Sequence, residues 1–443
     1  MRIGILIPVC SRAHDWKQFE DCFLMTHFLP AFKRTMSDAE YKIYIGVDID
    51  DQFFMSKIDK LEKIGRVLAL VNCNHAPAWA WNRLAEASYQ EGDEYMFQIG
   101  DDVILDTPMW TERFISKLRA HKNRGVVGPI NPVNAAARGG QNLVIENSFV
   151  HRSHLDIFGS FFYPTIRNWH CDEWMTRVYE GICSYTFEDV IVHNACIDKR
   201  YAIESRSIHE EIAESRQILR KALRGCFSFC LYGPYTDKYY HGLLENIPII
   251  REHYPKSEIV VYASPEAAPF VQIHCPGVTL HVTGEHGSRN MMHRFAPAFT
   301  DHYDFVCVRD TDSRIHARDR WCIDAFLDSP SKVYTIRDHQ WHQYLIMGGL
   351  WGCKGRIDGN MDDLQAFAAT QPEGYAIDTT FLSRYVYPRV QDTLLVFSHR
   401  PDGVIGNSNE KVCVIQHPVV NNEFCGNVVL YKDGVPYHEF TQV

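Results

Sequence analysis

The chain has 443 residues, of which 46% are hydrophobic and 23% are charged, and its formal net charge is −10. This length predicts two or three domains, each able to bury its own core. The acidic balance argues against broad binding to nucleic acid or anionic membranes, because such proteins present basic surfaces. No segment reaches the roughly 18 apolar residues of a membrane-spanning helix, so we expect a soluble, cytoplasmic protein without a cleaved leader.

The fourteen cysteines are scattered along the chain, and several lie inside apolar runs, as Cys230, Cys307 and Cys413 do. This distribution favours reduced, buried thiols over a disulfide framework. The sequence contains no Cys-x-x-Cys pair, so it gives little support for a structural zinc site.

Strands and helices are predicted to alternate along the first half of the chain. Apolar runs predict strands at residues 3–9, 42–47, 67–71 and 94–99. Helical patterns occur around residues 19–28 and 78–89. This βαβ rhythm predicts a mainly parallel sheet with helices on both faces.

A connecting helix is predicted at residues 206–225. Ser207 and Glu210 have the spacing of a capping box, and apolar residues then recur on one helical face as far as Leu223, before Gly225. A second series follows, with strands at 226–231, 258–262 and 305–308 and a helix at 242–253. We therefore expect two α/β domains, 1–205 and 226–443, with similar element order and little repeated sequence.

Acidic residues follow apolar strands in both halves. Gly100-Asp101-Asp102 ends one strand, and Asp48 with Asp50 ends another. In the second half, Asp310 and Asp312 are alternate residues on an extended segment, so their side chains can face the same cation. Ligands collect at the carboxyl ends of parallel strands, and carboxylates suit Mg²⁺ or Mn²⁺. The alternatives are solvated turns capped by aspartate, or a salt-bridged loop.

The first half resembles the nucleotide-sugar glycosyltransferases of the GT-A fold over about residues 1–200. The resemblance rests on the segments Ile-Pro-Val-Cys-Ser-Arg and Gly-Val-Asp, on the helix with Asn-Arg, and on Gly-Asp-Asp. It implies that the donor is contacted by Pro8, Arg12, Asp48, Asp50, Asn82 and Asp101. Asp102 would bind the metal, with His193 as a further ligand. Since Gly-Asp-Asp replaces the commoner Asp-x-Asp, the ligating carboxylate stays open between Asp101 and Asp102.

An acidic pair between tryptophans, in Asn-Trp-His-Cys-Asp172-Glu173-Trp, suits an acceptor sugar stacked on an aromatic ring. The family commonly places its acceptor-side base in such a pair. An inverting transfer needs this base, because the attacking hydroxyl must lose its proton. Asp172 is the first candidate and Glu173 the second. The alternative is a helix start with favourable negative charge.

The second half, over about residues 226–430, resembles a group of predicted GT-A-like transferases. It shares Tyr-Gly near residue 232, Arg-Asp-Thr-Asp-Ser-Arg, Arg-Asp-His and Gly-Gly-x-Trp-Gly. The resemblance implies metal binding by Asp310 and Asp312, with His417 as a third ligand. Sugar contacts would come from Asp338 and Asp378, and donor contacts from Tyr232, Arg309, Gly348 and Gly349. Asp378 precedes Thr where the family more often has Gln. No counterpart of Asp172 is evident, so a retaining transfer is open here.

These observations predict a bifunctional, metal-dependent glycosyltransferase that uses UDP-, GDP- or dTDP-linked sugars and extends a glycan. Tandem transferases of this kind occur in polysaccharide synthesis and in large DNA viruses. One alternative makes one domain a non-catalytic sugar-binding module. A nucleotidyltransferase would also use paired aspartates, but no Gly-x-x-x-x-Gly-Lys loop is present. A dehydrogenase is disfavoured because no Gly-x-Gly-x-x-Gly follows the first strand, and His339-x-x-His342 lacks the glutamate of a zinc hydrolase.

Overall fold

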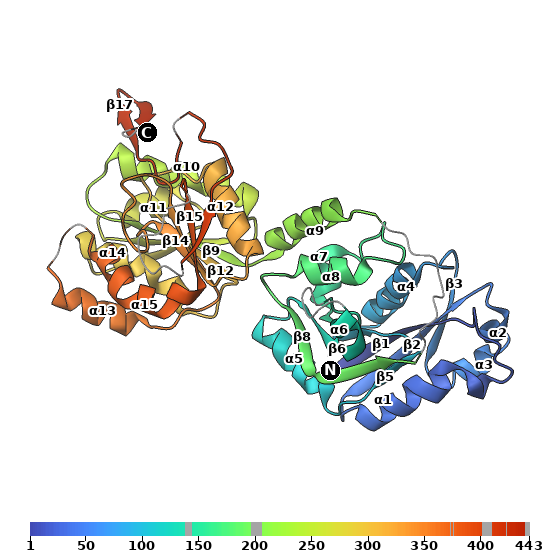
Figure 1. Cartoon of the computed structure of the whole chain (residues 1–443). Helices are drawn as coiled ribbons and strands as arrows, with labels where there is room; N and C mark the ends of the chain where they lie inside the picture. The colour runs from blue at the N-terminus through green and yellow to red at the C-terminus, as the bar shows by residue number, and fades with distance from the viewer. Residues whose placement is uncertain are drawn as a thin grey trace. The chain divides into compact units, whose positions relative to one another are not determined.

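The computed structural model describes residues 1–137, 144–195, 206–372, 374, 376–400, 410–421 and 423–438. The chain divides into two compact units, Met1–Leu219 (unit 1) and Arg220–Val443 (unit 2), which Figure 1 colours from blue to green and from green to red. None of the helices in the described ranges is both long and apolar enough to cross a membrane. The cysteines in these ranges are all free thiols, and most of them are buried.

Unit 1 contains an eight-stranded sheet in the order β3-β2-β1-β4-β7-β6-β8-β5. Strands β3, β2, β1 and β4 run parallel, β7 is antiparallel to both neighbours, β6 and β8 are parallel, and β5 is antiparallel to β8. Parallel strands buried on both faces are continuously apolar, as Ile3, Ile5, Leu6 and Ile7 of β1 are. The strands are β1 (Arg2–Val9), β2 (Glu40–Asp48), β3 (Arg66–Leu70), β4 (Tyr95–Gln98), β5 (Val103–Leu105), β6 (Val126–Ile130), β7 (Phe149–His151) and β8 (Ser184–Asn194).

The helices of unit 1 cover this sheet, and α9 runs across the division between the units. The segment predicted as one helix around residues 19–28 is a short 3₁₀ turn, η1 (Phe19–Asp21), and a π-helical stretch, η2 (Leu24–Phe28), which continues into α1. The helices are α1 (Leu29–Thr35), α2 (Gln52–Met55), α3 (Ile58–Leu61), α4 (Pro77–Gln90), α5 (Trp110–Ala120), α6 (Pro132–Ala137), α7 (Ser153–Phe158), α8 (Cys171–Val178) and α9 (His209–Ala222).

Unit 2 contains a second eight-stranded sheet, in the order β11-β10-β9-β12-β14-β13-β15-β16. Its only antiparallel strand among the described residues is β14, which separates the parallel set β11-β10-β9-β12 from the parallel set β13-β15-β16. The strands are β9 (Gly225–Leu231), β10 (Glu258–Ala263), β11 (Thr279–Val282), β12 (Phe305–Arg309), β13 (Val333–Arg337), β14 (Leu350–Lys354), β15 (Leu394–Ser398) and β16 (Lys411–Val414).

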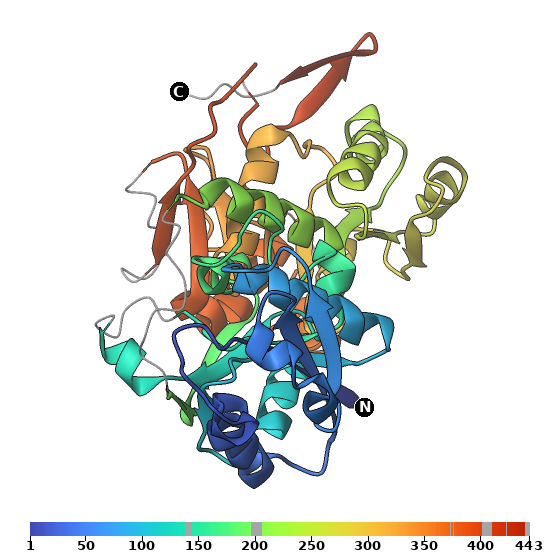
Figure 2. The same ribbon diagram turned by 90° about the vertical axis from the view of Figure 1, so that its right-hand side faces the viewer.

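The first long helix of unit 2, α10, begins at Asp237, one turn before the predicted start at Gly242. A separate hairpin of β17 (Val429–Lys432) and β18 (Val435–His438) projects from unit 2 and is drawn in red in Figures 1 and 2. The remaining elements are α10 (Asp237–His253), α11 (Ala268–His274), η3 (Ser288–Phe299), α12 (Ala317–Asp328), α13 (Met361–Thr370), α14 (Ile377–Phe381), η4 (Leu382–Val386), α15 (Tyr387–Val390) and η5 (Gln391–Thr393).

The two sheets share one topology. Once the edge strands β5 and β16 are set aside, each sheet places its first four strands in the order 3-2-1-4 and follows them with an antiparallel strand. The prediction of two α/β domains with mainly parallel sheets is confirmed. Because the first four strands of each sheet are parallel, their carboxyl ends form one edge, where ligands bind in such folds.

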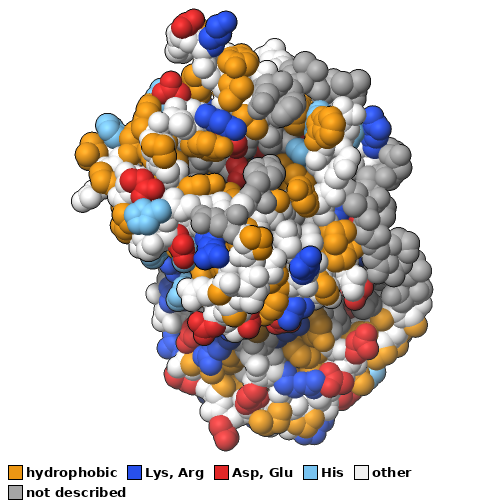
Figure 3. All heavy atoms as spheres, turned by 90° about the vertical axis from the view of Figure 1, so that its left-hand side faces the viewer, with side chains coloured by type: hydrophobic (Ala, Val, Ile, Leu, Met, Phe, Trp, Pro, Cys, Tyr) orange, Lys and Arg blue, Asp and Glu red, His pale blue; other side chains and the backbone are white. Residues whose placement is uncertain are grey.

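Charge on the surface is mixed. On the face drawn in Figure 3, Lys and Arg side chains are interspersed with Asp, Glu and hydrophobic side chains. No extended basic area is visible on that face among the atoms that are described.

A buried histidine joins the helices under the unit 1 sheet. The Tyr179 hydroxyl donates to His154 Nδ1 at 2.9 Å, and His154 Nε2 donates to the Phe161 carbonyl at 2.8 Å, an arrangement that suits a neutral imidazole. Burial lowers the pKa of His154 to about 4. The folded state therefore disfavours the protonated imidazole, whereas in the unfolded chain the same ring takes up a proton near pH 6.5.

We expect unit 1 to lose stability on acidification through this residue. The folded pKa lies below the unfolded one, so the contribution is complete above pH 6.5 and is lost as the pH falls towards 4. In the wild type, His154 should lower the unfolding free energy by about 2 kcal/mol between pH 7.5 and pH 5. His154→Gln should abolish this part of the pH dependence. Urea unfolding at both pH values measures this, with the exposed His209→Gln as the control. Equal pH dependence in wild type and His154→Gln would contradict the assignment.

Candidate functional site

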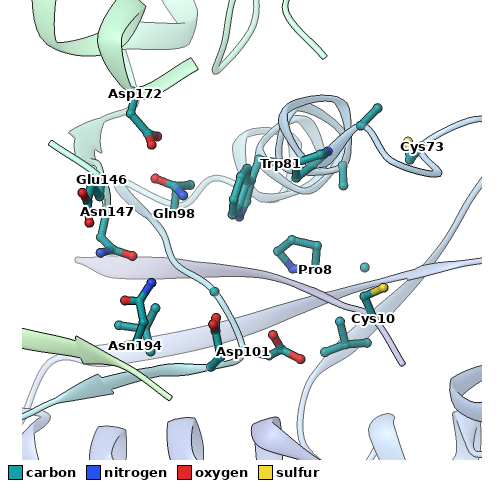
Figure 4. A pocket seen from close by; sticks show the side chains of 18 of the residues that line it. Pro8, Cys10, Cys73, Trp81, Gln98, Asp101, Glu146, Asn147, Asp172 and Asn194 are labelled. Atoms are coloured by element: carbon teal, nitrogen blue, oxygen red, sulfur yellow. The ribbon is translucent and has the colours of Figure 1, made fainter. Parts of the chain in front are cut away.

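Unit 1 holds a cavity of about 650 Å³ at the carboxyl edge of its sheet. Its walls include the final residues of the four parallel strands, namely Val9 of β1, Asp48 of β2, Leu70 of β3 and Gln98 of β4. Helix α4 contributes Trp81, whose ring Figure 4 shows at the rim of the cavity. The volume lies in the ordinary range of small-molecule sites.

The cavity is strongly acidic. Five carboxylates line it, while Arg12 is the one lysine or arginine among its described lining residues. These carboxylates are Asp48, Asp101, Asp102, Glu146 and Asp172. Like charges gathered on low-dielectric walls raise the local concentration of cations. An anionic ligand such as a diphosphate therefore requires a positive charge to enter with it.

Arg12 and Asp48 form an ion pair at the end of β2. Burial raises the pKa of Asp48, and the hydrogen bond from Arg12 opposes that rise. Asp51 holds the loop that carries Arg12, because its carboxylate accepts from the Ser11 amide at 2.7 Å and from the Ser11 hydroxyl at 2.8 Å. The first two strand ends are thus locked together, with Arg12 and Asp48 facing the cavity.

Asp101 and Asp102 lie directly after β4 and fit a hard cation. Both line the cavity, and the Asp101 side chain is fully buried beneath it. A side-chain carbon on Gly100 would lie 2.7 Å from Asp102 Oδ1, so only glycine leaves room for this carboxylate. Two adjacent carboxylates on a tight turn supply the oxygen ligands that Mg²⁺ or Mn²⁺ prefers. The donor set matches the metal that the sequence predicts.

The structure separates the two candidates for the acceptor-side base. Asp172, at the start of α8, points into the cavity from the side opposite Asp101 (Figure 4). Glu173 is not among the lining residues, and its carboxylate is 2.8 Å from His170 Nδ1. The geometry therefore favours Asp172, while Glu173 joins His170 in bracing the helix start.

Besides Glu173, three predicted residues of the first half lie outside the described cavity lining. Asn82 holds the chain near residue 162, since it donates to the Phe162 carbonyl at 3.0 Å and accepts from the Phe162 amide at 2.6 Å. His193 of β8 lies 3.1 Å from the carboxylate of Asp106, which follows the paired edge strand β5. Asp50 is exposed and accepts from the Asn74 amide at 2.5 Å. Asp50 also lies 3.7 Å from Arg12 Nη2, so it contacts a residue of the cavity lining without lining it.

Sequence reasoning missed several polar residues of the cavity, including Gln98, Glu146 and Asn147. Gln98 carried a usable signal, because a glutamine at the end of a buried apolar strand needs a partner. It accepts from the Ser148 amide at 2.9 Å and so fixes the segment that holds Asn147. Glu146 and Asn147 follow no motif, and only the pairing of β7 beside β4 brings them here.

Unit 2 has a smaller cavity, of about 290 Å³, at the corresponding edge of its sheet. Asp310 and Asp312 follow β12, and Asp378 lies in the first turn of α14. Gly348 and Gly349 form part of the wall, as predicted residues near a donor would. A side-chain carbon on Gly349 would lie 1.9 Å from Asp310 Oδ2, which explains why glycine stands beside the acidic motif.

The unit 2 carboxylates are already paired with cations of the chain. Arg294, buried in η3, contacts Asp310 and also donates to Asp378 Oδ2 at 2.7 Å. Lys238 of α10 lies 3.2 Å from Asp312 Oδ2. Burial, together with the neighbouring Asp310 carboxylate, raises the pKa of Asp312 to about 6. Each of the three carboxylates therefore has a cationic partner within the chain, although the Asp310 side chain is 44% exposed.

Four further predicted residues of unit 2 lie outside its described cavity lining. Asp338 is buried and accepts from Arg318 Nε at 2.6 Å. Arg309 is buried and donates to Asp319 Oδ1 at 2.6 Å, which leaves it no access to a donor diphosphate. Tyr232 and His417 are half-buried and do not line the cavity. An arginine beside an Asp-x-Asp motif looks the same in sequence whether it faces ligand or core.

No family model matches the chain, and no curated protein matches it. Among solved structures, TarS of S. aureus has 12% identity and a TM-score of 0.32, over 50% of this chain and 42% of TarS. The mannosyltransferase PcManGT from Pyrobaculum calidifontis, in complex with GDP-Man and Mn²⁺, has 11% identity and a TM-score of 0.34, over 44% of this chain and 56% of its own. Glucosyl-3-phosphoglycerate synthase from Mycobacterium tuberculosis has 14% identity and a TM-score of 0.30, over 49% and 76%. The chain thus spans less than half of TarS.

We expect Arg294 to be essential to the stability of unit 2. Arg294→Gln leaves the buried Asp378 carboxylate without its cation, which should lower the unfolding free energy by about 3–5 kcal/mol. Scanning calorimetry measures the loss, with Arg289→Gln in the same 3₁₀ segment as the control. Adding Asp378→Asn to Arg294→Gln should recover part of it, because the uncompensated charge is removed. An unchanged transition in Arg294→Gln would contradict this account.

Proposed function

We propose that unit 1 is a metal-dependent glycosyltransferase that takes its sugar from a nucleotide-sugar donor and passes it to a glycan. The observation that carries the proposal is the convergence of Asp48, Asp101, Asp102 and Asp172 on one cavity at the carboxyl edge of a mainly parallel sheet. The solved structures similar to this chain include complexes with UDP or GDP-Man and Mn²⁺, which agrees with this class of ligand.

In this proposal Asp101 and Asp102 hold a divalent cation, Mn²⁺ or Mg²⁺, which would neutralise the donor diphosphate as the glycosidic bond breaks. Arg12 and Asp48 bind the nucleoside at the ends of β1 and β2. Their ion pair pre-organises both side chains, so little conformational freedom is lost when the donor binds. UDP, GDP and dTDP donors all suit a cavity of this size and polarity.

Asp172 acts as the general base of an inverting transfer. Its carboxylate accepts the proton of the acceptor hydroxyl while that oxygen attacks the anomeric carbon. The bond between the anomeric carbon and the diphosphate oxygen breaks, and the nucleoside diphosphate leaves with the electron pair. Trp169, which is exposed at the cavity rim, offers an aromatic face for the acceptor sugar.

For unit 2 the pairing of its carboxylates favours a sugar-binding module over a second transferase. Arg294 and Lys238 already neutralise part of the negative charge of these carboxylates, and the cavity is less than half as large as that of unit 1. Trp341 is exposed at its edge and can stack on a sugar ring. The bifunctional enzyme, with a retaining second site, stays the competing prediction.

The metal requirement of unit 1 is tested by donor turnover. Asp102→Asn should lower Mn²⁺-dependent hydrolysis or transfer of the active nucleotide sugar by roughly 100-fold or more, because the cation loses a ligand and the diphosphate its counter-charge. Chromatographic assay of a panel of UDP-, GDP- and dTDP-sugars with and without Mn²⁺ gives the result. The exposed Asp59→Asn on α3 is the matched control.

The same panel decides the role of unit 2 through the double variant Asp310→Asn/Asp312→Asn. Full turnover of every donor in this variant supports a binding module. If the double variant no longer turns over a donor that the Asp102→Asn variant still uses, unit 2 is a second transferase instead. Absence of any metal-dependent turnover in the wild-type chain would overturn the proposed function.

The roles of Asp172 and Glu173 are separable by kinetics. Asp172→Asn should lower kcat by about 10²–10⁴-fold with a small change in the donor KM, since the amide cannot accept the proton. Glu173→Gln, which keeps a hydrogen-bonding partner for His170, should retain most of the activity. Steady-state assays with a saturating acceptor compare the two variants. The reverse order of effects would move the base to Glu173.

A further inference from the structure

A second group of metal-ligating side chains lies in unit 2, apart from the aspartates of the cavity. One ligand atom each from His316, Asp319 and Cys425 lie within 4.8 Å of one another. His316 caps the N-terminus of α12, Asp319 lies in its first turn, and Cys425 comes from a loop near the end of the chain. Nitrogen, oxygen and sulfur ligands in this combination are those that Zn²⁺ takes.

Cys322 offers a further thiol, which lies beside Cys425 and outside this group of three. It lies one turn beyond Asp319 on α12 and is fully buried. Its thiol interacts with the Cys425 thiol as a hydrogen-bonding partner. Asp319 and Cys322, three apart on the helix, share a face that can turn towards the loop of Cys425, and His316 precedes them at the N-cap position. Four ligands complete the tetrahedral shell of a closed zinc site.

One buried polar atom of this region lacks a partner when no cation is bound. His316 Nε2 is buried and has no hydrogen-bond partner among the described residues, although most buried polar atoms have one. The two thiols are fully buried in the same place. A cation bound here would displace the protons of the thiols, since the thiolate is the form that binds metal.

The charges of such a site balance with the arginine beside it. A dication held by one carboxylate, two thiolates and one neutral imidazole has a net charge of −1. Arg309, which donates to Asp319 Oδ1 at 2.6 Å, supplies the compensating positive charge. A hydrogen bond to a ligating carboxylate also orients it, as supporting residues do in metal sites. The buried Arg309, which does not reach the cavity, has a role in this arrangement.

We propose that His316, Asp319, Cys322 and Cys425 form a structural zinc site in unit 2. With four protein ligands it has no open position, so it holds the fold rather than catalysing a reaction. The site ties the loop of Cys425 to α12, beside the bond from the Cys425 amide to Asp338 Oδ2 at 2.8 Å. Phe424 and Gly426 on either side of Cys425 line the cavity, so the metal would fix one of its walls.

Metal analysis of the full-length protein tests the proposal. After expression in zinc-supplemented medium and gel filtration with EDTA, the wild type should retain about one zinc per chain, because closed sites bind tightly. Cys425→Ser and His316→Ala should each lose most of it. Cys275→Ser, a buried cysteine of the same unit outside the group, should keep it. Wild-type protein that is free of zinc, or zinc retained at full stoichiometry by both ligand variants, overturns the site.

A measurement on the wild type alone removes any dependence on the folding of the variants. Protein stripped of zinc and titrated with Co²⁺ should show thiolate-to-cobalt charge-transfer absorption and the visible bands of tetrahedral cobalt, both of which added Zn²⁺ abolishes. Removal of the metal should also lower the melting temperature of unit 2, since binding stabilises the folded state. Cobalt spectra without a thiolate band, or a Cys322–Cys425 disulfide in the intact mass, would refute the proposal.

Discussion

In each unit, the aspartates at the carboxyl edge of the sheet must be offset by nearby positive charge, and the arrangement of the site depends on how this is done. Parallel strands deliver their last residues to one edge, and in this chain many of those residues are aspartates. Carboxylates crowded on low-dielectric walls repel one another and lose solvation, so each edge needs positive charge close by. Unit 1 provides one arginine among the described lining residues of its cavity, whereas unit 2 supplies Arg294 and Lys238 from two separate elements.

This difference gives two units of the same topology different chemical capacities. The unit 1 cavity keeps an excess of carboxylates and is large enough for a nucleotide sugar, so cation and donor can enter together. In unit 2 the carboxylates are paired with Arg294 and Lys238, and burial still raises the pKa of Asp312. Fold alone does not assign activity, and the side chains at the sheet edge separate the two cases.

Buried ion pairs also fix the loops of unit 2. Arg318 binds Asp338, and Arg337 binds Glu410 at 2.8 Å, so strand β13 is tied to both α12 and the segment before β16. Such pairs gain little net stability, but breaking one leaves an uncompensated charge in the core. They therefore select one arrangement of the loops over others. The proposed zinc site lies at the same junction and would act in the same direction, on the loop of Cys425.

The sequence by itself determined the leading strands of each half and the acidic motifs that follow them. A short, continuous apolar run such as residues 3–9 favours a buried strand, and the glycine before Asp101 indicates a sharp turn after the strand. Only the tertiary structure decided which charged groups meet. Arg294, Glu146 and the partners of Asp338 come from segments far from any motif, and their positions depend on strand order and helix packing. The local pattern of apolar residues indicates which side chains are buried. It does not indicate which charged residues meet, because those pairs form only when distant segments pack together.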